Sequence, residues 1–276
     1  MPELPEVETI RRALMKQLPG KRIKRIVVRD ARLRWPVEEG KLRSLLVRQR
    51  IRDIQRRAKY LLVRFENENR LLLHLGMSGR ILFLTKKAPL EKHDHVQFNL
   101  SGSAELRFRD PRRFGLVEAV TPEEFATHPR LVNLGVEPLD TQVDHRQLFG
   151  LAKNRKKPIK NLLMDANFMV GVGNIYANEA LFFAGIHPAT PVTLLGETDW
   201  KNLLQQIRSV LNAAIKQGGT TLNDFVNSDG ETGYFQLSLA VYDREGKSCI
   251  RCHSKIERLV QVGRSSFFCP QCQAKT

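Results

Sequence analysis

Four cysteines near the end of the chain have the spacing of a metal site. They fall within the last 28 residues as two C-x2-C pairs separated by 16 residues: Cys249, Cys252, Cys269 and Cys272. Each pair aims two thiolates at one point, and four thiolates make the closed tetrahedral set of a structural zinc site. Two disulfides or free thiols are the alternative, but disulfides are uncommon in the cytosol. The spacing therefore predicts one structural zinc ion.

The segment between the two cysteine pairs has the pattern of a β-hairpin. Polar and apolar residues alternate on both sides of Gly263 and Arg264. We therefore expect the hairpin to turn at these two residues and to bring the two C-x2-C pairs together.

The start of the chain carries a second chemically distinctive group, a proline directly after Met1. If Met1 is removed, the Pro2 nitrogen is a secondary amine; if Met1 persists, the nitrogen is an amide and cannot act as a nucleophile. An α-amino group has a pKa near 7.7–8, so roughly one molecule in ten carries the unprotonated amine at pH 7. Such an amine can attack a carbonyl-like carbon and form an imine, with Glu3 or Glu6 as proton donor or acceptor. The alternative is that Pro2 merely begins the chain and both glutamates cap a helix.

The composition indicates a folded chain with a polyanionic partner. There are 45 Lys and Arg against 29 Asp and Glu, a net charge of +16, and 42% of the residues are hydrophobic. That hydrophobic content argues against a mostly disordered protein, and neither a run of about 18 apolar residues nor a secretory signal is found. With neither feature we expect an intracellular protein. Because the basic residues are spread along the chain and the cysteines have a zinc pattern, we expect this protein to bind nucleic acid. An anionic membrane surface or a merely solvated basic face is the alternative.

The elements that must position these groups change character along the sequence. Residues 5–18 have the apolar spacing of an amphipathic helix, whereas residues 22–120 contain short apolar runs separated by turns, as in an antiparallel sandwich or barrel. Residues 135–217 are mostly helical in pattern, and the polar, glycine-rich residues 218–238 are expected to form a loop. Prolines cluster over 122–140, where we expect a domain boundary.

The sequence therefore predicts an α+β chain with three domains. Residues 1–134 would form an N-terminal β-sandwich with flanking helices, residues 135–238 a helical domain with the loop, and residues 239–276 the zinc-bound hairpin. No internal repeat or low-complexity tract interrupts this order.

Six segments, spread over the full length and in the same order, resemble the sequence blocks of the formamidopyrimidine-DNA glycosylase family. They are MPELPEVETI (1–10), HLGMSG (74–79), KHDHV (92–96), RDPRRFG (109–115), MVGVGNIYANEALF (169–182) and GRSSFFCPQC (263–272). The resemblance implies a catalytic sandwich domain, a helix-two-turn-helix domain and a zinc finger. It also implies a bifunctional DNA glycosylase and abasic-site lyase of base excision repair that excises oxidised purines such as 8-oxoguanine and formamidopyrimidines.

The resemblance assigns catalytic roles to five residues. Pro2 would attack C1′ of the damaged nucleotide, Glu3 would protonate the sugar ring oxygen, and Glu6 would support the site. The resulting imine would allow β- and then δ-elimination, which cut the strand on both sides of the lesion. Lys59 matches the family's catalytic lysine, and Arg264 matches the hairpin arginine that reaches a DNA phosphate. The alternative for Lys59 is an ordinary surface lysine.

Further residues match DNA-contacting positions of the family. Met77, Arg112 and Phe114 match the set that fills the void left by a flipped base, although Met77 and Phe114 could instead be core residues. The other matched positions are His74, His93, Lys156, Lys160 and Asn174. The loop at 218–238 resembles the segment that closes over the flipped base.

The expected partner is therefore double-stranded DNA that contains oxidised purines or abasic sites. The resemblance also implies monomeric action in the bacterial cytosol or nucleoid, away from membranes. Two other interpretations remain: a glycosylase that prefers oxidised pyrimidines, and a catalytically silent zinc-ribbon protein that only binds DNA.

Overall fold

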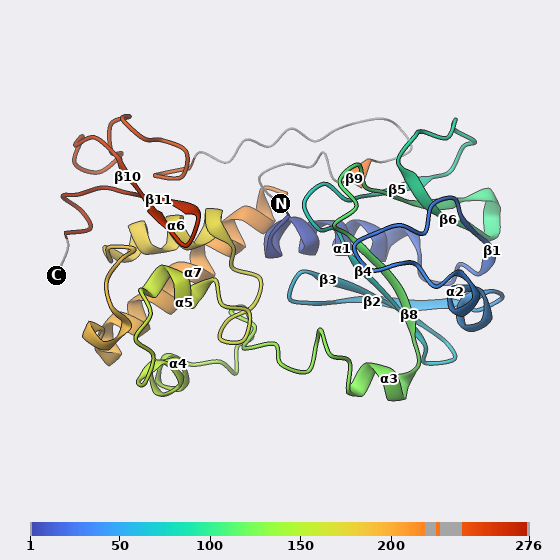
Figure 1. Cartoon of the computed structure of the whole chain (residues 1–276), viewed down its shortest axis with the longest axis horizontal. Helices are drawn as coiled ribbons and strands as arrows, with labels where there is room; N and C mark the ends of the chain where they lie inside the picture. Colours follow the sequence, from blue (N-terminus) through green and yellow to red (C-terminus); the bar gives the residue numbers. More distant parts are fainter. Residues whose placement is uncertain (1, 219–224, 227–238, 275–276) are drawn as a thin grey trace. The chain divides into compact units, whose positions relative to one another are not determined.

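The computed structural model describes residues 2–218, 225–226 and 239–274, which divide into two compact units (Figure 1). The first unit comprises residues 2–132, 217–218 and the short strand β9 (Phe225–Val226). The second comprises Asn133–Lys216 and residues 239–274. By this division the helical segment and the cysteine hairpin share one unit. The three-domain division drawn from the sequence stays a prediction.

Two β-sheets form the first unit (Figure 1). The five-stranded sheet has the order β1-β6-β7-β5-β9, with β1 Ile23–Val28, β5 Arg80–Leu84, β6 Asp94–Leu100 and β7 Glu105–Arg109. The four-stranded sheet has the order β2-β3-β4-β8, with β2 Ile51–Arg57, β3 Tyr60–Phe65, β4 Arg70–His74 and β8 Leu116–Val120. Among the described strands, every pairing is antiparallel except the one between β5 and β9.

One hydrophobic core joins both sheets to the first helix, α1 (Leu4–Gln17). The buried side chains of α1 recur at helical spacing, with Val7, Ile10 and Leu14 each at most 1% exposed. The remaining helical elements of this unit are α2 (Glu39–Leu46), a 3-10 turn (Ser101–Ser103) and α3 (Pro122–Ala126). The predicted N-terminal helix and antiparallel sandwich are thus confirmed.

The second unit is mainly helical (Figure 1). Its elements are α4 (His145–Ala152), α5 (Ile159–Leu163), α6 (Asn174–Ala184), a 3-10 turn (Val192–Leu194) and α7 (Glu197–Lys216). The amphipathic α7 buries Trp200 and Leu211 completely and packs on α4 and α6. Two turns join α5 to α6, which is the expected helix-two-turn-helix arrangement.

The cysteine hairpin consists of β10 (Glu257–Gln261) and β11 (Arg264–Phe268). Gln261 pairs with Arg264, so the turn contains only Val262 and Gly263. The sequence placed Gly263 and Arg264 in the turn; Gly263 is there, but Arg264 is the first residue of β11. Of the predicted loop at 218–238, residues 219–224 and 227–238 lie outside the described residues. No helix in the described part of the chain is long and apolar enough to cross a membrane.

Candidate active site and metal centre

The first candidate residues lie at the N-terminal end of α1. Glu3 is the N-cap of this helix, and Glu3 and Glu6 form a reciprocal capping box in which Glu6 Oε2 accepts from the Glu3 backbone N–H at 2.8 Å. Pro2 is buried, and Glu3 and Glu6 are only 3% and 4% exposed. Capping alone does not require burial of the capping side chains. The two glutamates therefore cap the helix and also form a pair of buried carboxyl groups. The positive end of a helix dipole stabilises anions and disfavours a protonated amine beside it.

Lys59 occupies the tight turn between β2 and β3, and a partly buried ion pair connects this turn to α1. Arg56 donates to the carbonyl oxygen of Ala58 at 2.9 Å and contacts Glu8 on α1 at 3.3 Å. Ala58 itself has φ +53°, a left-handed conformation that a non-glycine residue adopts only when its surroundings hold it there. The Glu8–Arg56 pair therefore connects α1, which begins two residues after Pro2, to the turn that carries Lys59.

Glu8 is held ionised by several arginines. Burial alone would raise the pKa of this carboxyl group, but hydrogen bonds from Arg11 and Arg12 and the charge of Arg56 lower it overall. Neither Glu8 nor Arg56 was among the residues predicted from the sequence. The sequence offered one indication: a glutamate on the apolar side of a helix is uncommon unless a charged partner pairs with it.

His74 ends β4, directly opposite Tyr60 in the neighbouring strand β3. The two rings pack against each other with centroids 4.8 Å apart and planes tilted by 47°. Burial lowers the pKa of His74 to about 4, assisted by the positive charges of Lys59 and Arg34. The ring is therefore neutral at pH 7, and its Nδ1 accepts the backbone N–H of Gly76 at 3.0 Å. Because Nδ1 is an acceptor, the single ring proton lies on Nε2, which is then a donor.

Met77, Arg112 and Phe114 lie on two loops that pack against each other. Gly76, with φ +59°, approaches Phe114 so closely that a Cβ atom there would be 2.5 Å from the Phe114 backbone carbon. The Arg112 guanidinium lies 5.2 Å from the centre of the Phe114 ring. Met77 and Phe114 are 43% and 38% exposed, so they are surface residues and not core residues. The alternative of two core residues is thus wrong.

A fully buried carboxylate, Asp110, holds these two loops together. Its oxygens accept from the Ser78 hydroxyl at 2.6 Å, the Gly115 N–H at 2.8 Å and the Arg112 N–H at 3.3 Å. Its own N–H donates to the carbonyl oxygen of His93 at 3.1 Å, which places His93 beside the same loop. Asp110 was not among the sequence candidates, although an aspartate before proline is typical of a turn that its side chain organises.

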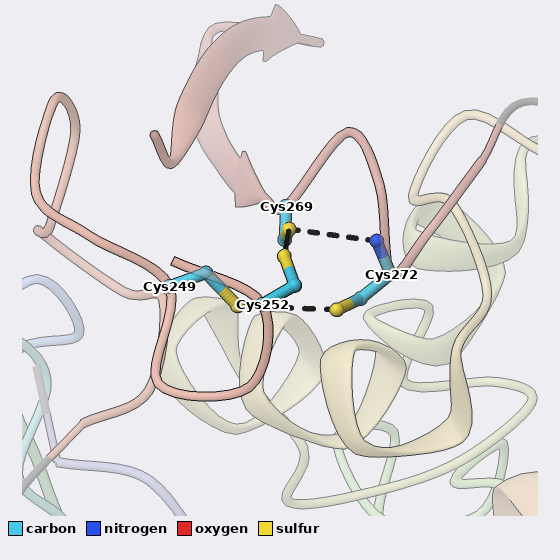
Figure 2. Close-up of side chains that lie close together, drawn as sticks. All are labelled: Cys249, Cys252, Cys269 and Cys272. Atoms are coloured by element: carbon cyan, nitrogen blue, oxygen red, sulfur yellow. Dashed lines mark hydrogen bonds between the residues drawn. The ribbon is translucent and has the colours of Figure 1, made fainter. Parts of the chain in front are cut away.

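The four cysteines of the second unit converge as predicted (Figure 2). Figure 2 shows Cys249 and Cys252 on one loop and Cys269 and Cys272 on another, with their sulfur atoms turned toward one another. All four Sγ atoms lie within 4.8 Å of each other. The Sγ atoms of Cys249 and Cys272 are 3.9 Å apart, and those of Cys252 and Cys269 are 3.3 Å apart.

These distances fit a zinc ion. Four sulfur atoms at the usual 2.3 Å from zinc lie about 3.8 Å from one another in a tetrahedron. Backbone N–H groups of Arg251 and Cys272 point at the Cys249 and Cys269 sulfur atoms at 3.4 and 3.5 Å, which is suited to stabilising thiolates. The zinc finger is thus a closed structural site formed by thiolates, with no position left for substrate.

The helices hold the hairpin through buried polar side chains. Lys160 of α5 is only 1% exposed, and its Nζ donates to the Ser265 carbonyl oxygen and the Ser266 hydroxyl, each at 2.7 Å. From the family resemblance we expected Lys160 to contact DNA. The structure instead encloses its ammonium group within the unit, one residue from Arg264 along β11. Lys160 thus positions the strand that carries Arg264.

Arg264 itself is exposed and lines an open hollow of about 540 Å³ beside α5. Lys157 lies in the same wall and pairs with Asp165 at 2.7 Å. Lys156 precedes it in an exposed loop between α4 and α5. This part of the second unit therefore presents several cations to solvent.

Asn174 is the first residue of α6, after the glycine-containing turn at 171–173. Its Oδ1 is buried without a hydrogen-bond partner among the described residues. Asn178, one turn later, donates to the Asn174 carbonyl oxygen at 2.5 Å and accepts the Phe267 N–H of β11 at 2.7 Å. One buried side chain thus connects the start of α6 to the hairpin.

Comparison with known proteins assigns the chain to a family. The family model for the formamidopyrimidine-DNA glycosylase N-terminal domain matches residues 1–117. The model for the H2TH domain of the same glycosylase matches residues 134–226, and the zinc finger found in FPG and IleRS matches residues 246–275. The chain belongs to the formamidopyrimidine-DNA glycosylase family.

Individual relatives agree over their whole length. The formamidopyrimidine-DNA glycosylase of Magnetococcus marinus is 48% identical, covering 99% of each chain, and that of Methylococcus capsulatus is 49% identical, covering 99% of this chain and all of the relative. Among solved structures, a point mutant of Lactococcus lactis FPG bound to Fapy-dG DNA has a TM-score of 0.90 at 32% identity. The match covers 99% of this chain and 100% of the mutant. The Lactococcus lactis complex with abasic-site DNA has a TM-score of 0.89 at 34% identity and the same coverage.

The structure groups the predicted residues into clusters within each unit. In the first unit, Lys59 lies near His74, and Met77, Arg112 and Phe114 share a pair of packed loops. His93, in the turn before β6, lies beside one of these loops through its hydrogen bond with Asp110. In the second unit, Lys160 supports the strand of Arg264, and the four cysteines form the metal site.

Proposed function

We propose that this chain is a bifunctional DNA glycosylase and abasic-site lyase of base excision repair that excises oxidised purines. The observation that carries the proposal is membership of the formamidopyrimidine-DNA glycosylase family over the entire length. The solved relatives support the substrate class, because their complexes contain Fapy-dG, carbocyclic 8-oxo-G or an abasic site. The net charge of +16 suits a DNA partner.

The glycosylase step assigns the nucleophile to the Pro2 amine once Met1 has been removed. Its nitrogen attacks C1′ of the damaged nucleotide, and the bond from C1′ to the base breaks with both electrons leaving on the base. The proton that the nitrogen loses after the attack passes to the departing base, directly or through water, which frees the nitrogen lone pair for the imine. Glu3 donates a proton to the sugar ring oxygen, so the ring opens and a positively charged imine links Pro2 to C1′. The buried carboxyl group of Glu6, which accepts from the Glu3 N–H, keeps this end of α1 in place.

The lyase steps follow from the imine. Its positive charge acidifies the hydrogens on C2′, so a base removes one of them and the bond from C3′ to the 3′ phosphate breaks. A second elimination through the conjugated imine breaks the bond from C5′ to the 5′ phosphate. Water then hydrolyses the imine and returns the free amine. An activated water could release the base but could not cut the strand, which is why an amine serves this reaction.

Phosphate binding is assigned to donors of both units. In the first unit, Lys59 supplies a cation, and neutral His74 supplies its Nε2 proton without adding charge. In the second unit, Arg264, Lys156 and Asn174 are exposed or partly exposed and can reach a phosphate. Guanidinium groups stay charged at all working pH values, so we assign Arg264 to phosphate binding rather than to proton donation.

The exposed side chains of the two packed loops are assigned to the void left by the flipped base. Met77 and Phe114 would insert apolar bulk into the stack, and Arg112 would hydrogen-bond to the orphaned base. The zinc ion, held by the four cysteines, would fix the hairpin fold and take no part in the chemistry. The roles of His93 and of the segment at 218–238 rest on the resemblance alone. We also propose a location in the bacterial cytosol, where the chromosome lies.

The test is cleavage of an 8-oxoguanine duplex by the purified protein and two variants. We expect base release and strand cutting by the wild type, and loss of both by at least about 100-fold in Glu3→Gln, which cannot donate the proton. Pro2→Gly keeps a terminal amine and should retain partial activity, whereas N-terminal acetylation should abolish it. Wild-type cleavage that survives acetylation would contradict the proposal.

A glycosylase for oxidised pyrimidines is the second candidate. It is favoured by the solved complex of wild-type Lactococcus lactis Fpg with DNA containing an oxidised pyrimidine, 34% identical to this chain. Single-turnover excision from matched thymine glycol and 8-oxoguanine duplexes decides between the two substrate classes.

A further inference from the structure

The tip of the cysteine hairpin has an unfavourable residue for its backbone. Gln261 pairs with Arg264, so Val262 and Gly263 alone make the turn, with φ +47° and +71°. Two positive φ angles in a two-residue hairpin define the type I′ turn, which strongly favours Asn-Gly. Valine is β-branched, and its presence in the left-handed region is unusual. Folding alone does not account for valine at this position.

Hydrogen bonds nevertheless fix the strands directly below the turn. Below it, the Gln261 side chain donates to the Pro188 carbonyl oxygen at 3.2 Å and accepts from the Ser266 hydroxyl at 2.6 Å. The Lys160 ammonium group donates to the same hydroxyl at 2.7 Å. A strained residue supported in this way is typical of a functional position.

Val262 is also the most exposed large hydrophobic residue among those described. It is 85% exposed, against 63% for Val260 on the preceding strand. It lines the same hollow as Arg264 and as Lys157, which pairs there with Asp165, so an apolar side chain stands beside a paired lysine and the charge that Arg264 presents, unpaired among the described residues. A ligand that satisfies both would carry anionic groups next to apolar carbon atoms, as a DNA backbone does where each phosphate joins a deoxyribose.

We propose that Val262 is a DNA-binding residue whose side chain packs on a deoxyribose adjacent to the phosphate that Arg264 binds. The proposal rests on the DNA repair function proposed above. It explains why the turn keeps a valine where asparagine would fold better: the methyl groups contribute to DNA binding at the expense of hairpin stability.

The test is the variant Val262→Asn, because stability and binding should change in opposite directions. Asparagine suits the turn, so the thermal midpoint of the zinc-loaded protein should rise by about 2–4 °C. Loss of the apolar contact should weaken binding to a duplex with a tetrahydrofuran abasic analogue by about 3- to 10-fold. Zinc content, measured by mass spectrometry, should stay at one per chain.

Val262→Ile is the matched control, since it keeps an apolar β-branched side chain and should bind within about 2-fold of the wild type. Equal binding by Val262→Asn, or a lowered midpoint in that variant, would overturn the proposal. This outcome can be distinguished from failure of the proposed function. If the wild type binds and cleaves lesion DNA and Val262→Asn binds the same DNA with equal affinity, only the role of Val262 is refuted.

Discussion

At the scale of single residues, Asp110 shows how a buried carboxylate can set the shape of two loops. Its carboxylate is fully buried and accepts three hydrogen bonds. In Asp110→Asn one carboxylate oxygen is replaced by an amide N–H₂, which cannot accept and would face an existing donor. We expect a loss of about 1–3 kcal/mol in the free energy of unfolding, because buried donors are left unsatisfied. Urea unfolding measures this loss.

The control for Asp110 is Asp140→Asn. Asp140 is exposed and its side chain accepts one turn hydrogen bond, from the Gln142 N–H at 2.9 Å, so its change should stay within about 0.5 kcal/mol. Equal effects of the two variants would show that Asp110 does not organise the loops.

The neutral His74 predicts a specific pH dependence. Its pKa is about 4 in the folded chain and 6.5 when exposed, because burial opposes its charge. Between pH 6.5 and 4 the unfolded chain therefore binds a proton that the folded chain does not, so stability is lost as the pH falls through this window. The loss attributable to His74 is up to about 3 kcal/mol.

The variant His74→Asn tests this, because an amide oxygen can still accept the Gly76 N–H but does not titrate. Denaturant unfolding at about pH 7 and about pH 4.5 should show a smaller loss of stability on acidification for the variant than for the wild type. Identical losses would mean that His74 titrates normally in the folded protein.

At the scale of elements, β11 depends on Lys160 although the two are about a hundred residues apart in sequence. We expect Lys160→Met to reduce strand cleavage by at least about 10-fold while the dependence of DNA affinity on salt keeps its slope, because Lys160 does not neutralise a phosphate. Arg264→Gln should reduce the slope by about one, as expected when one phosphate contact is lost. Equal changes of slope would show that Lys160 reaches DNA itself.

Some helices and strands could be predicted from the sequence, and others had only a weak pattern. The α1 helix, the central strands and the cysteine hairpin have clear periodicity, and they were predicted. The strand β2 (Ile51–Arg57) leaves a weaker pattern within the predicted β region at 22–120, because its two apolar residues are three apart and the rest are polar or charged. It forms a strand because β3 provides its hydrogen bonds and Glu8 pairs with its Arg56.

The candidate site could be predicted where the type and spacing of its residues indicate a particular chemistry. The cysteine spacing predicted the metal site, the proline at position 2 with its neighbouring glutamates indicated amine chemistry, and the family resemblance supplied the remaining candidates. Partners such as Asp110 and Asn178 were missed, and Lys160 was assigned to DNA although it is buried. Their roles depend on backbone groups that come close only after folding, and no sequence pattern records those contacts.

At the scale of the whole molecule, each of the two units carries one tryptophan, Trp35 in the first and Trp200 in the second. Chelation of zinc should remove DNA binding first, because the metal holds the hairpin and its anchors while the sandwich has a core of its own. Each unit can be followed by the fluorescence of its own tryptophan: Trp35→Phe leaves Trp200 as the reporter of the second unit, and Trp200→Phe leaves Trp35 as the reporter of the first. In a strong chelator, the Trp200 fluorescence should shift at a denaturant concentration at which the Trp35 fluorescence is unchanged. Simultaneous unfolding of both signals would contradict this independence.

The most direct test of the mechanism is reductive trapping followed by mass mapping. The protein is incubated with an 8-oxoguanine duplex and borohydride, digested, and the sugar-bearing peptide is sequenced by mass spectrometry. The account predicts a covalent adduct on the nitrogen of Pro2, in a peptide that lacks Met1. A fully active protein whose mass still includes Met1, or an adduct on a lysine such as Lys59, would contradict it.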